Sequence, residues 1–205
     1  RDMKRLSGGA LGVMIGVTNI EKSLAVYRDI LGYDEIVYDK TGVFQDWGFM
    51  EGSEETYRRV LLTHSQPRKG AFSEIFGKSY IELVTALDRE PRKIFENRYW
   101  GDPGYIQLCM DVSNMKELGK FCAEKGFPFT VDSCPGDIQF DMGDASGHFT
   151  YIEDPDGTLI EFVEAHKIPI LKKLGWYLDL KKRDVSKPLP QWLLGCLRWS
   201  KMKFE

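Results

Sequence analysis

Hydrophobic and polar residues follow the same order in two parts of the chain. Residues 12–27, GVMIGVTNIEKSLAVY, and residues 107–122, QLCMDVSNMKELGKFC, each begin with an alternating strand pattern and continue through a polar residue into a helical pattern. The apolar residues at helical spacing are Ile20, Leu24, Tyr27 and Leu31 in the first copy and Met115, Leu118 and Cys122 in the second. The pattern therefore predicts a repeated unit, and a missed repeat would misplace the whole fold.

Each predicted helix has a polar residue at its start. Thr18 with Glu21 fits a capping box, in which two side chains satisfy the unpaired amides of the first turn. In the second copy, either Ser113 or Asn114 is expected to cap the helix. These residues mark where the two helices are predicted to begin.

Three strand-like segments follow each helix. They are residues 35–39, 58–64 and 79–87 in the first copy and 127–132, 148–154 and 158–165 in the second. The last strands match again, with IELV at 81–84 and IEFV at 160–163. We therefore predict an α+β protein of two tandem βαβββ modules. Neither module has enough core to be stable alone, so their sheets are expected to join around a shared cavity.

The predicted organisation has five parts. They are an N-terminal segment at 1–10, the first module at 11–87, a linker at 88–104, the second module at 105–165 and a C-terminal extension at 166–205. The extension is basic, with ten Lys and Arg against three Asp and Glu, whereas the whole chain carries a net charge of −3. The extension is therefore compositionally a separate piece.

The C-terminal extension also carries an amphipathic pattern. Trp192, Cys196 and Trp199 recur at helical spacing after Pro190, which predicts a short helix. Basic charge of this kind also occurs on surfaces that bind nucleic acids or membranes. We expect instead that the tryptophans and leucines cover an apolar surface of the modules or of a partner, in a homodimer or with another protein. No nucleic-acid partner is expected.

Two segments carry a resemblance to a known family. VTNIEKSLAVYRDILGY at 17–33 and YIEDPDGTLIEFVE at 151–164 resemble the vicinal oxygen chelate superfamily, which includes glyoxalase I, bleomycin-resistance proteins and extradiol dioxygenases. The resemblance covers about residues 11–165 and implies the paired βαβββ fold. It implies function less sharply, because one fold hosts several chemistries and some pure binders.

The resemblance also implies a set of metal ligands. In metal-dependent members, the ligands come from the first and last strands of each module, and the matching positions are Gly12, Glu82, Gln107 and Glu161. Glu82, Gln107 and Glu161 offer oxygen atoms that suit a hard divalent ion. Gly12 replaces the histidine usual in the family and has no side chain to donate. The ions left open are Mg²⁺, Mn²⁺, Zn²⁺ and Ni²⁺.

Strand alternation gives candidate residues for the lining of the cavity. Met14 shares a face with Gly12, and Cys109 shares a face with Gln107, so both are candidate substrate-binding residues, with packing as the alternative. Trp47, from an aromatic and glycine-rich segment, is a candidate for gripping an apolar or aromatic substrate. Packing of Trp47 in the core is an equal alternative.

The register of the last hairpin decides which side chains accompany Glu161. If DPDG folds as a two-residue turn, Thr150 pairs with Glu161 and His148 lies on the same face, whereas a slip of one residue would move both away. With the two-residue turn, Glu82, Glu161 and His148 are the candidate catalytic groups and Thr150 is a candidate substrate-binding residue. The other histidines, at 64 and 166, are expected to be surface groups.

The expected function is that of a glyoxalase-like, metal-assisted isomerase or lyase acting on a small oxygenated molecule. A divalent ion would polarise neighbouring oxygens while a carboxylate moves a proton. An extradiol dioxygenase is not expected, because its iron needs two histidines and one glutamate. The alternative is a metal-free protein of the bleomycin-resistance kind that binds a small ligand.

No stretch approaches the roughly 20 apolar residues of a membrane span, so a cytoplasmic location is the default expectation.

Overall fold

The computed structural model describes residues 10–136, 140–141, 146–171, 174–184 and 186–197. Its contacts divide the chain into two compact units. Unit 1 comprises Arg1–Gln66 and Lys78–Arg92, and unit 2 comprises Pro67–Gly77 and Lys93–Glu205. The segment Pro67–Gly77 therefore belongs with unit 2, although it lies between two strands of unit 1.

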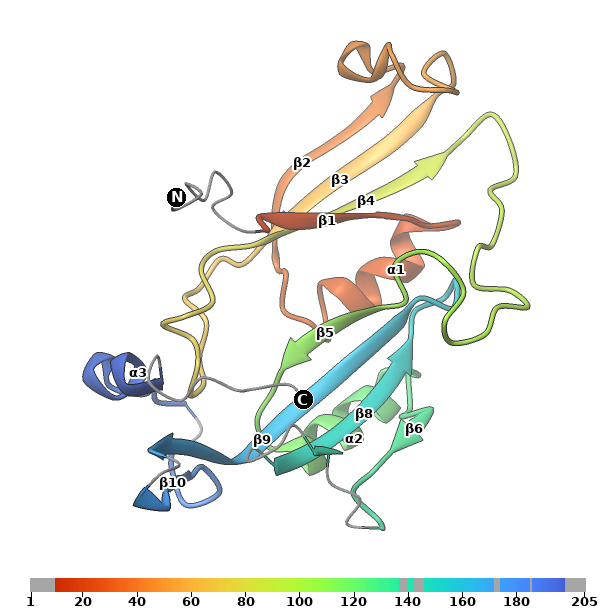
Figure 1. Cartoon of the computed structure of the whole chain (residues 1–205). Coiled ribbons are helices and arrows are strands. Elements are labelled where there is room, and N and C mark those ends of the chain that lie inside the picture. Colours follow the sequence, from red (N-terminus) through yellow and green to blue (C-terminus); the bar gives the residue numbers. More distant parts are fainter. Residues whose placement is uncertain (1–9, 137–139, 142–145, 172–173, 185, 198–205) are drawn as a thin grey trace, which may run out of the picture. The chain divides into compact units, whose positions relative to one another are not determined.

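Unit 1 is a four-stranded sheet with one helix (Figure 1). Its elements are β1 (Gly12–Gly16), α1 (Ile20–Tyr27), β2 (Glu35–Gly42), the 3-10 turn η1 (Gln45–Trp47), β3 (Tyr57–Thr63) and β4 (Tyr80–Ala86). The sheet order is β1-β4-β3-β2, with β1 parallel to β4 and the other pairs antiparallel. The predicted helix stripe packs inward, because Ile20, Leu24 and Tyr27 are all buried.

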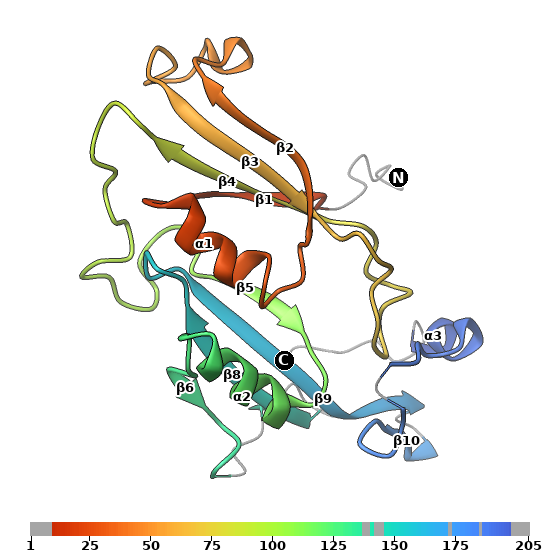
Figure 2. The ribbon, with the colours of Figure 1, turned by 180° about the vertical axis from the view of Figure 1, so that it is seen from behind.

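Unit 2 repeats this arrangement and extends it. Its elements are β5 (Gln107–Asp111), α2 (Met115–Glu124), β6 (Val131–Asp132), β7 (Phe140–Asp141), β8 (Ser146–Glu153), β9 (Leu159–Leu171), β10 (Trp176–Asp179) and α3 (Gln191–Leu197). Strand β9 pairs in parallel with β5 and antiparallel with β8 and β10. Helix α2 lies against β8 and β9 (Figures 1 and 2). The predicted α+β class and the strand-helix repeat are confirmed.

The helix starts differ in detail from the prediction. Asn19, not Thr18, is the N-cap of α1, and its side chain accepts a hydrogen bond of 3.0 Å from the amide three residues on. Asn114 is the N-cap of α2, but its own side chain makes no capping bond. The carboxylate of Glu164 on β9 accepts the amides of Asn114 and Met115 instead, at 2.5 and 3.3 Å. A side chain of the sheet thus caps the second helix.

The turn between β8 and β9 is longer than the predicted two residues. Glu153 pairs with Leu159, which leaves five residues in the turn. The side chain of Asp154 accepts the backbone amides of Asp156 and Thr158, at 2.9 and 2.8 Å. Aspartate readily replaces a backbone acceptor in this way and stabilises a wider turn.

The longer turn shifts the strand register by one residue. Tyr151, not Thr150, is the partner of Glu161, and His148 is the partner of Glu164. The prediction that Thr150 and His148 share a face with Glu161 is therefore wrong, because a one-residue slip reverses the face of every side chain. Thr150 is fully buried, and its hydroxyl lies 3.3 Å from a methionine sulfur of α2.

The C-terminal part of the chain is built into unit 2. Strand β9 continues beyond the predicted end of the second module, and the predicted C-terminal helix is present as α3. Leu189 and Leu193 form a buried cluster with Ile168 and Ile170 of β9, and the Leu189 amide donates to the carbonyl of Ala71. These contacts bind the segment before α3 to the sheet.

The tryptophans of this region are less buried than expected. Trp192 is 64% exposed and Trp176 is 45% exposed, so neither is covered within the described part of the chain. Trp199 lies outside the described residues. Among the residues that the structure describes, no helix is long and apolar enough to cross a membrane.

Candidate functional site

Glu82, the family-type position in unit 1, forms a buried ion pair. Its Oε1 accepts the Nε–H of Arg59 at 2.5 Å and the hydroxyl of Tyr38 at 2.6 Å. The side chains of Arg59 and Glu82 are only 9% and 10% exposed. Desolvation and the bond to Glu82 raise the pKa of Tyr38 to about 12, so the phenol stays protonated and remains a donor. The carboxylate is therefore engaged by protein donors.

Arg59 is held from its other side as well. Its Nη1 lies 2.9 Å from Asp46, and the guanidinium carbon lies 4.2 Å from the ring centroid of Trp47 and 4.7 Å from that of Phe44. The Trp47 ring also meets the edge of Tyr57, with centroids 5.1 Å apart. Trp47 is thus half-buried in a cation-π cluster, and its candidate role in substrate binding stays a prediction.

The backbone around Gly12 has no room for a side chain. Gly12 pairs with Tyr80 in the parallel β1–β4 ladder. A Cβ atom at position 12 would lie 2.3 Å from the carbonyl oxygen of Tyr80, so a larger residue would require the backbone to shift. Met14 is the ladder partner of Glu82 and is 51% exposed. Gly12 therefore offers neither a ligand nor space for one.

In unit 2, Gln107 and Glu161 bond to each other. The Gln107 amide donates to Glu161 Oε2 at 2.5 Å, and the Tyr151 hydroxyl lies 3.0 Å from both Glu161 Oε1 and Gln107 Oε1 as a donor. Desolvation and the Glu161 carboxylate raise the pKa of Tyr151 to about 12. Cys109 is exposed and is the ladder partner of Glu161. Tyr151 is missing from the predicted site because the predicted register turned it away.

The four family-type positions do not fit a metal ion well. Gly12 has no donor, and Glu82 is neutralised by a guanidinium that an ion would have to displace. Glu161 accepts hydrogen bonds from the Gln107 amide nitrogen and the Tyr151 hydroxyl, and Gln107 Oε1 accepts from the same hydroxyl. An all-oxygen set with these competing bonds would hold a divalent ion only by breaking hydrogen bonds to charged groups, which contribute about 1.5–3 kcal/mol each.

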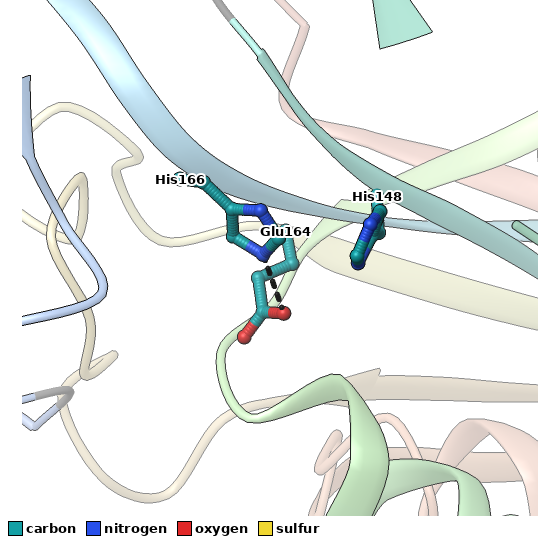
Figure 3. Close-up of side chains that lie close together, drawn as sticks. All are labelled: His148, Glu164 and His166. Carbon is teal, nitrogen blue, oxygen red and sulfur yellow. Dashed lines mark hydrogen bonds and ion pairs between the residues drawn. The ribbon is translucent and has the colours of Figure 1, made fainter. Parts of the chain in front are cut away.

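A different group of candidate side chains lies on the face of the unit 2 sheet opposite to Gln107 and Glu161. Figure 3 shows the three residues of this group. His148 comes from β8, and Glu164 and His166 come from β9. The His166 Nε2 lies 3.1 Å from Glu164 Oε2, and the two imidazole rings meet edge to face with centroids 4.6 Å apart. His166 is only 8% exposed, so the expectation that it is a surface group is wrong.

These three side chains border a cavity of about 400 Å³ within unit 2. Its remaining lining is Ala71, Phe72, Asp111, Val112, Ser113, Asn114, Ala165, Leu180, Lys181, Arg183, Asp184 and Lys187. The cavity thus combines residues of the sheet, the start of α2 and the segment between β10 and α3. Its volume falls in the range of ordinary small-molecule sites.

Asp111, at the end of β5, is an exposed residue that lines this cavity, and its carboxyl has a raised pKa. Desolvation by the surrounding protein raises that pKa to about 6, against a smaller lowering by Arg68. Carboxyl groups with raised pKa values are a common feature of functional clefts. The sequence pattern singled out neither Asp111 nor Glu164, since both belong to strands that otherwise look like ordinary half-buried strands.

Comparison with known proteins agrees with this fold. A family model described as the Glyoxalase/Bleomycin resistance protein/Dioxygenase superfamily matches residues 11–162. No curated protein matches the chain in sequence.

A solved structure supports the same architecture. A glyoxalase family protein from Bacillus cereus is 14% identical, with a TM-score of 0.57 over 79% of this chain and 97% of that chain. A glyoxalase family protein from Enterococcus faecalis is 19% identical, with a TM-score of 0.48 over 77% of this chain and 98% of that chain. At such low identity, the first likeness shows the fold alone. The family match covers well over half of the chain and confirms the resemblance seen in its motifs. The chain belongs to the Glyoxalase/Bleomycin resistance protein/Dioxygenase superfamily.

Proposed function

We propose that the protein binds a small, oxygen-rich anionic molecule in the cavity of unit 2. One observation carries this proposal: among the described residues, two buried nitrogen atoms without a hydrogen-bond partner, Arg183 Nε and His166 Nδ1, belong to residues that line this cavity. Leaving such a group unsatisfied costs about 1–3 kcal/mol. A ligand oxygen that accepts from Arg183 would recover that free energy on binding.

Three cations of the cavity wall, set against the carboxylates of Asp111, Glu164 and Asp184, supply donors for an anionic ligand. Lys181, Arg183 and Lys187 all come from the short segment between β10 and α3. Arg183 Nη2 makes only a long bond of 3.4 Å to the carbonyl of Pro188, and Lys187 lies 3.6 Å from Asp184. A guanidinium presents several donors in a fixed plane, which suits a carboxylate or phosphate. Phe72 and Leu180 are apolar residues of the cavity wall. We therefore expect the ligand to carry a small carbon skeleton beside its anionic group.

This proposal takes up the binding alternative, a protein of the bleomycin-resistance kind, in preference to metal-assisted chemistry at the family positions. The reason lies at two of these positions. Glu82 forms an ion pair with Arg59, and Gly12 has no metal-binding side chain and no room for one. Isomerase or lyase activity on the bound molecule is the second candidate, and Asp111 favours it. A carboxyl in the cavity with a pKa of about 6 could accept a proton from a carbon next to an oxygenated centre near neutral pH.

Amide NMR spectra of the full chain, titrated with L-lactate, D-glycerate and inorganic phosphate, test the proposal. We expect at least one of the three to shift the amides of residues 111–114, 164–166 and 180–184. Arg183→Gln should weaken binding by about tenfold, because a hydrogen bond to a charged group contributes about 1.5–3 kcal/mol. Lys182→Gln is the matched control: this neighbouring side chain is 84% exposed and lies outside the cavity lining, so the affinity should stay unchanged.

The same samples separate the two candidate functions. New ligand resonances that grow with time, and that Asp111→Asn abolishes without loss of binding, would favour the isomerase or lyase. Shifts at residues outside the cavity, or equal affinities for Arg183→Gln and Lys182→Gln, would show that the proposed site is wrong.

A further inference from the structure

We propose that His148, Glu164 and His166 form a site for a divalent metal ion, separate from the positions that bind metal elsewhere in the family. Their candidate ligand atoms all lie within 4.8 Å of one another. Donor atoms about 2.0–2.1 Å from a tetrahedral zinc ion lie about 3.3 Å apart. The His166–Glu164 pair, at 3.1 Å, already has this spacing, and the candidate ligand atom of His148 lies within 4.8 Å of both.

The pairing of β8 with β9 brings the three residues together. His148 is the ladder partner of Glu164 across the antiparallel β8–β9 pair, so their side chains project from the same face. His166 follows Glu164 by two residues on the same strand and shares that face as well. The ladder shifts register beside His166, between Ser146 and Gly147. Irregularities of this kind commonly re-aim a side chain next to a functional site.

The site lies on the face of the unit 2 sheet opposite to Gln107 and Glu161. Glu161 and Glu164 are three residues apart on one strand, so their side chains project to opposite sides. Glu161 bonds to Gln107 and Tyr151, whereas Glu164 bonds to the start of α2. The proposed ion therefore cannot be the family's ion held by a shifted set of ligands.

Glu164 is oriented by bonds outside the cluster. One carboxylate oxygen, Oε1, accepts the backbone amides of Asn114 and Met115, and the other, Oε2, points to His166. Outer bonds of this type fix a ligand's position and preserve its charge, and they accompany most metal ligands in proteins. The positive end of the α2 dipole also favours a carboxylate there. The Glu164 carboxylate is thus held in place before a metal ion binds.

The donor set indicates which ions would bind. Two imidazoles and one carboxylate suit Zn²⁺, Mn²⁺, Fe²⁺ or Ni²⁺, and Zn²⁺ commonly takes three such protein ligands with a further position open to solvent or substrate. His166 Nε2, which lies 3.1 Å from Glu164 Oε2, is the nitrogen of that ring placed to bind the ion. The residues around the cluster also line the cavity, so the open position would face it.

Calorimetric titration of the untagged, chelator-treated full chain with Zn²⁺ and with Mn²⁺ tests the site. The inference does not depend on the proposed small-molecule function, because only the metal is added. We expect one Zn²⁺ per chain. Glu164→Gln and His166→Gln should each weaken binding by more than about tenfold, since loss of an outer-shell partner alone can have that effect. Glu164→Gln keeps an oxygen for the helix amides, and so the fold should persist.

His64→Gln is the matched control, because it makes the same substitution at a histidine in unit 1. Its Zn²⁺ affinity should equal that of the unaltered chain. Absence of stoichiometric binding by either ion would overturn the proposal. Equal affinities for Glu164→Gln, His166→Gln and His64→Gln would do so as well.

A second measurement needs no variant. Mn²⁺ bound at the cluster should broaden the amide resonances of residues 114–115, 147–149 and 164–167 in the unaltered chain more than those of residues 81–83. The reverse order would place the ion at Glu82 and contradict the proposal. A variant that fails to fold therefore does not remove the test.

Discussion

Replacing Arg59 by methionine is expected to lower the free energy of unfolding by about 3–5 kcal/mol, because it leaves the buried Glu82 carboxylate without its counter-ion. The two side chains are 9% and 10% exposed and are joined by a bond of 2.5 Å. The substitution also removes the cation between Trp47 and Phe44. Urea unfolding monitored by tryptophan fluorescence measures the change.

Two further variants show whether burial is the cause. Arg58→Met makes the same substitution one residue away, where the guanidinium is 29% exposed and pairs with Asp39 and Glu21 at the surface. Its expected loss is at most about 1 kcal/mol, as for other surface pairs. In the double variant Arg59→Met with Glu82→Leu, most of the lost stability should return, since both buried charges are gone. Equal losses for Arg58→Met and Arg59→Met would show that Glu82 is not held by a buried ion pair and is available as a ligand.

Replacing Leu189 by alanine is expected to lower the free energy of unfolding by about 2–5 kcal/mol, the usual cost of a cavity left by a fully buried leucine. Leu189 is 1% exposed and packs with Ile168, Ile170 and Leu193. The segment just before it carries Lys181, Arg183 and Lys187, which form one wall of the cavity. The variant should therefore also weaken binding of any ligand that requires this wall.

Leu174→Ala is the matched control for this prediction. Leu174 belongs to the same part of the chain but is 79% exposed, so the substitution should change stability by no more than about 0.5 kcal/mol. Urea unfolding and ligand titration of both variants give the comparison. If Leu189→Ala is as stable as Leu174→Ala, Leu189 does not anchor the segment before α3 to the sheet. Some other contact would then hold this segment in place as a wall of the cavity.

Periodicity in the sequence predicted the architecture because it reports burial directly. The stripe from Ile20 to Tyr27 is buried where the pattern indicates, and so are Met115 and Cys122 of its counterpart, whereas Leu118 is half-buried. Each helix also follows a short strand. The pattern also places the start of α2 correctly, because Asn114 is its N-cap, but it does not reveal which side chain satisfies the first amides. Glu164 caps α2 from β9, and nothing in the residues near Asn114 announces this contact.

The candidate site was harder to predict, because it depends on one turn. Asp154 bonds to two amides of its own turn, which widens the turn and shifts the register by one residue. That shift moves His148 from the face of Glu161 to the face of Glu164. The pattern Glu-x-His at 164–166 was visible in the sequence, but it acquires chemical meaning only when His148 is placed opposite it.

The arrangement of Glu82 could not be anticipated from its matched position in the repeat either. Glu82 and Glu161 occupy equivalent strands, yet one bonds to an arginine and the other to a glutamine and a tyrosine. Position in the repeat fixes which face each side chain occupies. It does not determine which neighbours satisfy the charge.

The most direct test of the central claim, that the chemistry of this chain lies in the cavity of unit 2, is crystallographic. An anomalous difference map recorded at the zinc absorption edge, from crystals grown with Zn²⁺, locates the ion without reference to any activity. We expect a peak bonded to His148, Glu164 and His166. A peak at Glu82, or at Gln107 and Glu161, with none at the cluster would contradict it.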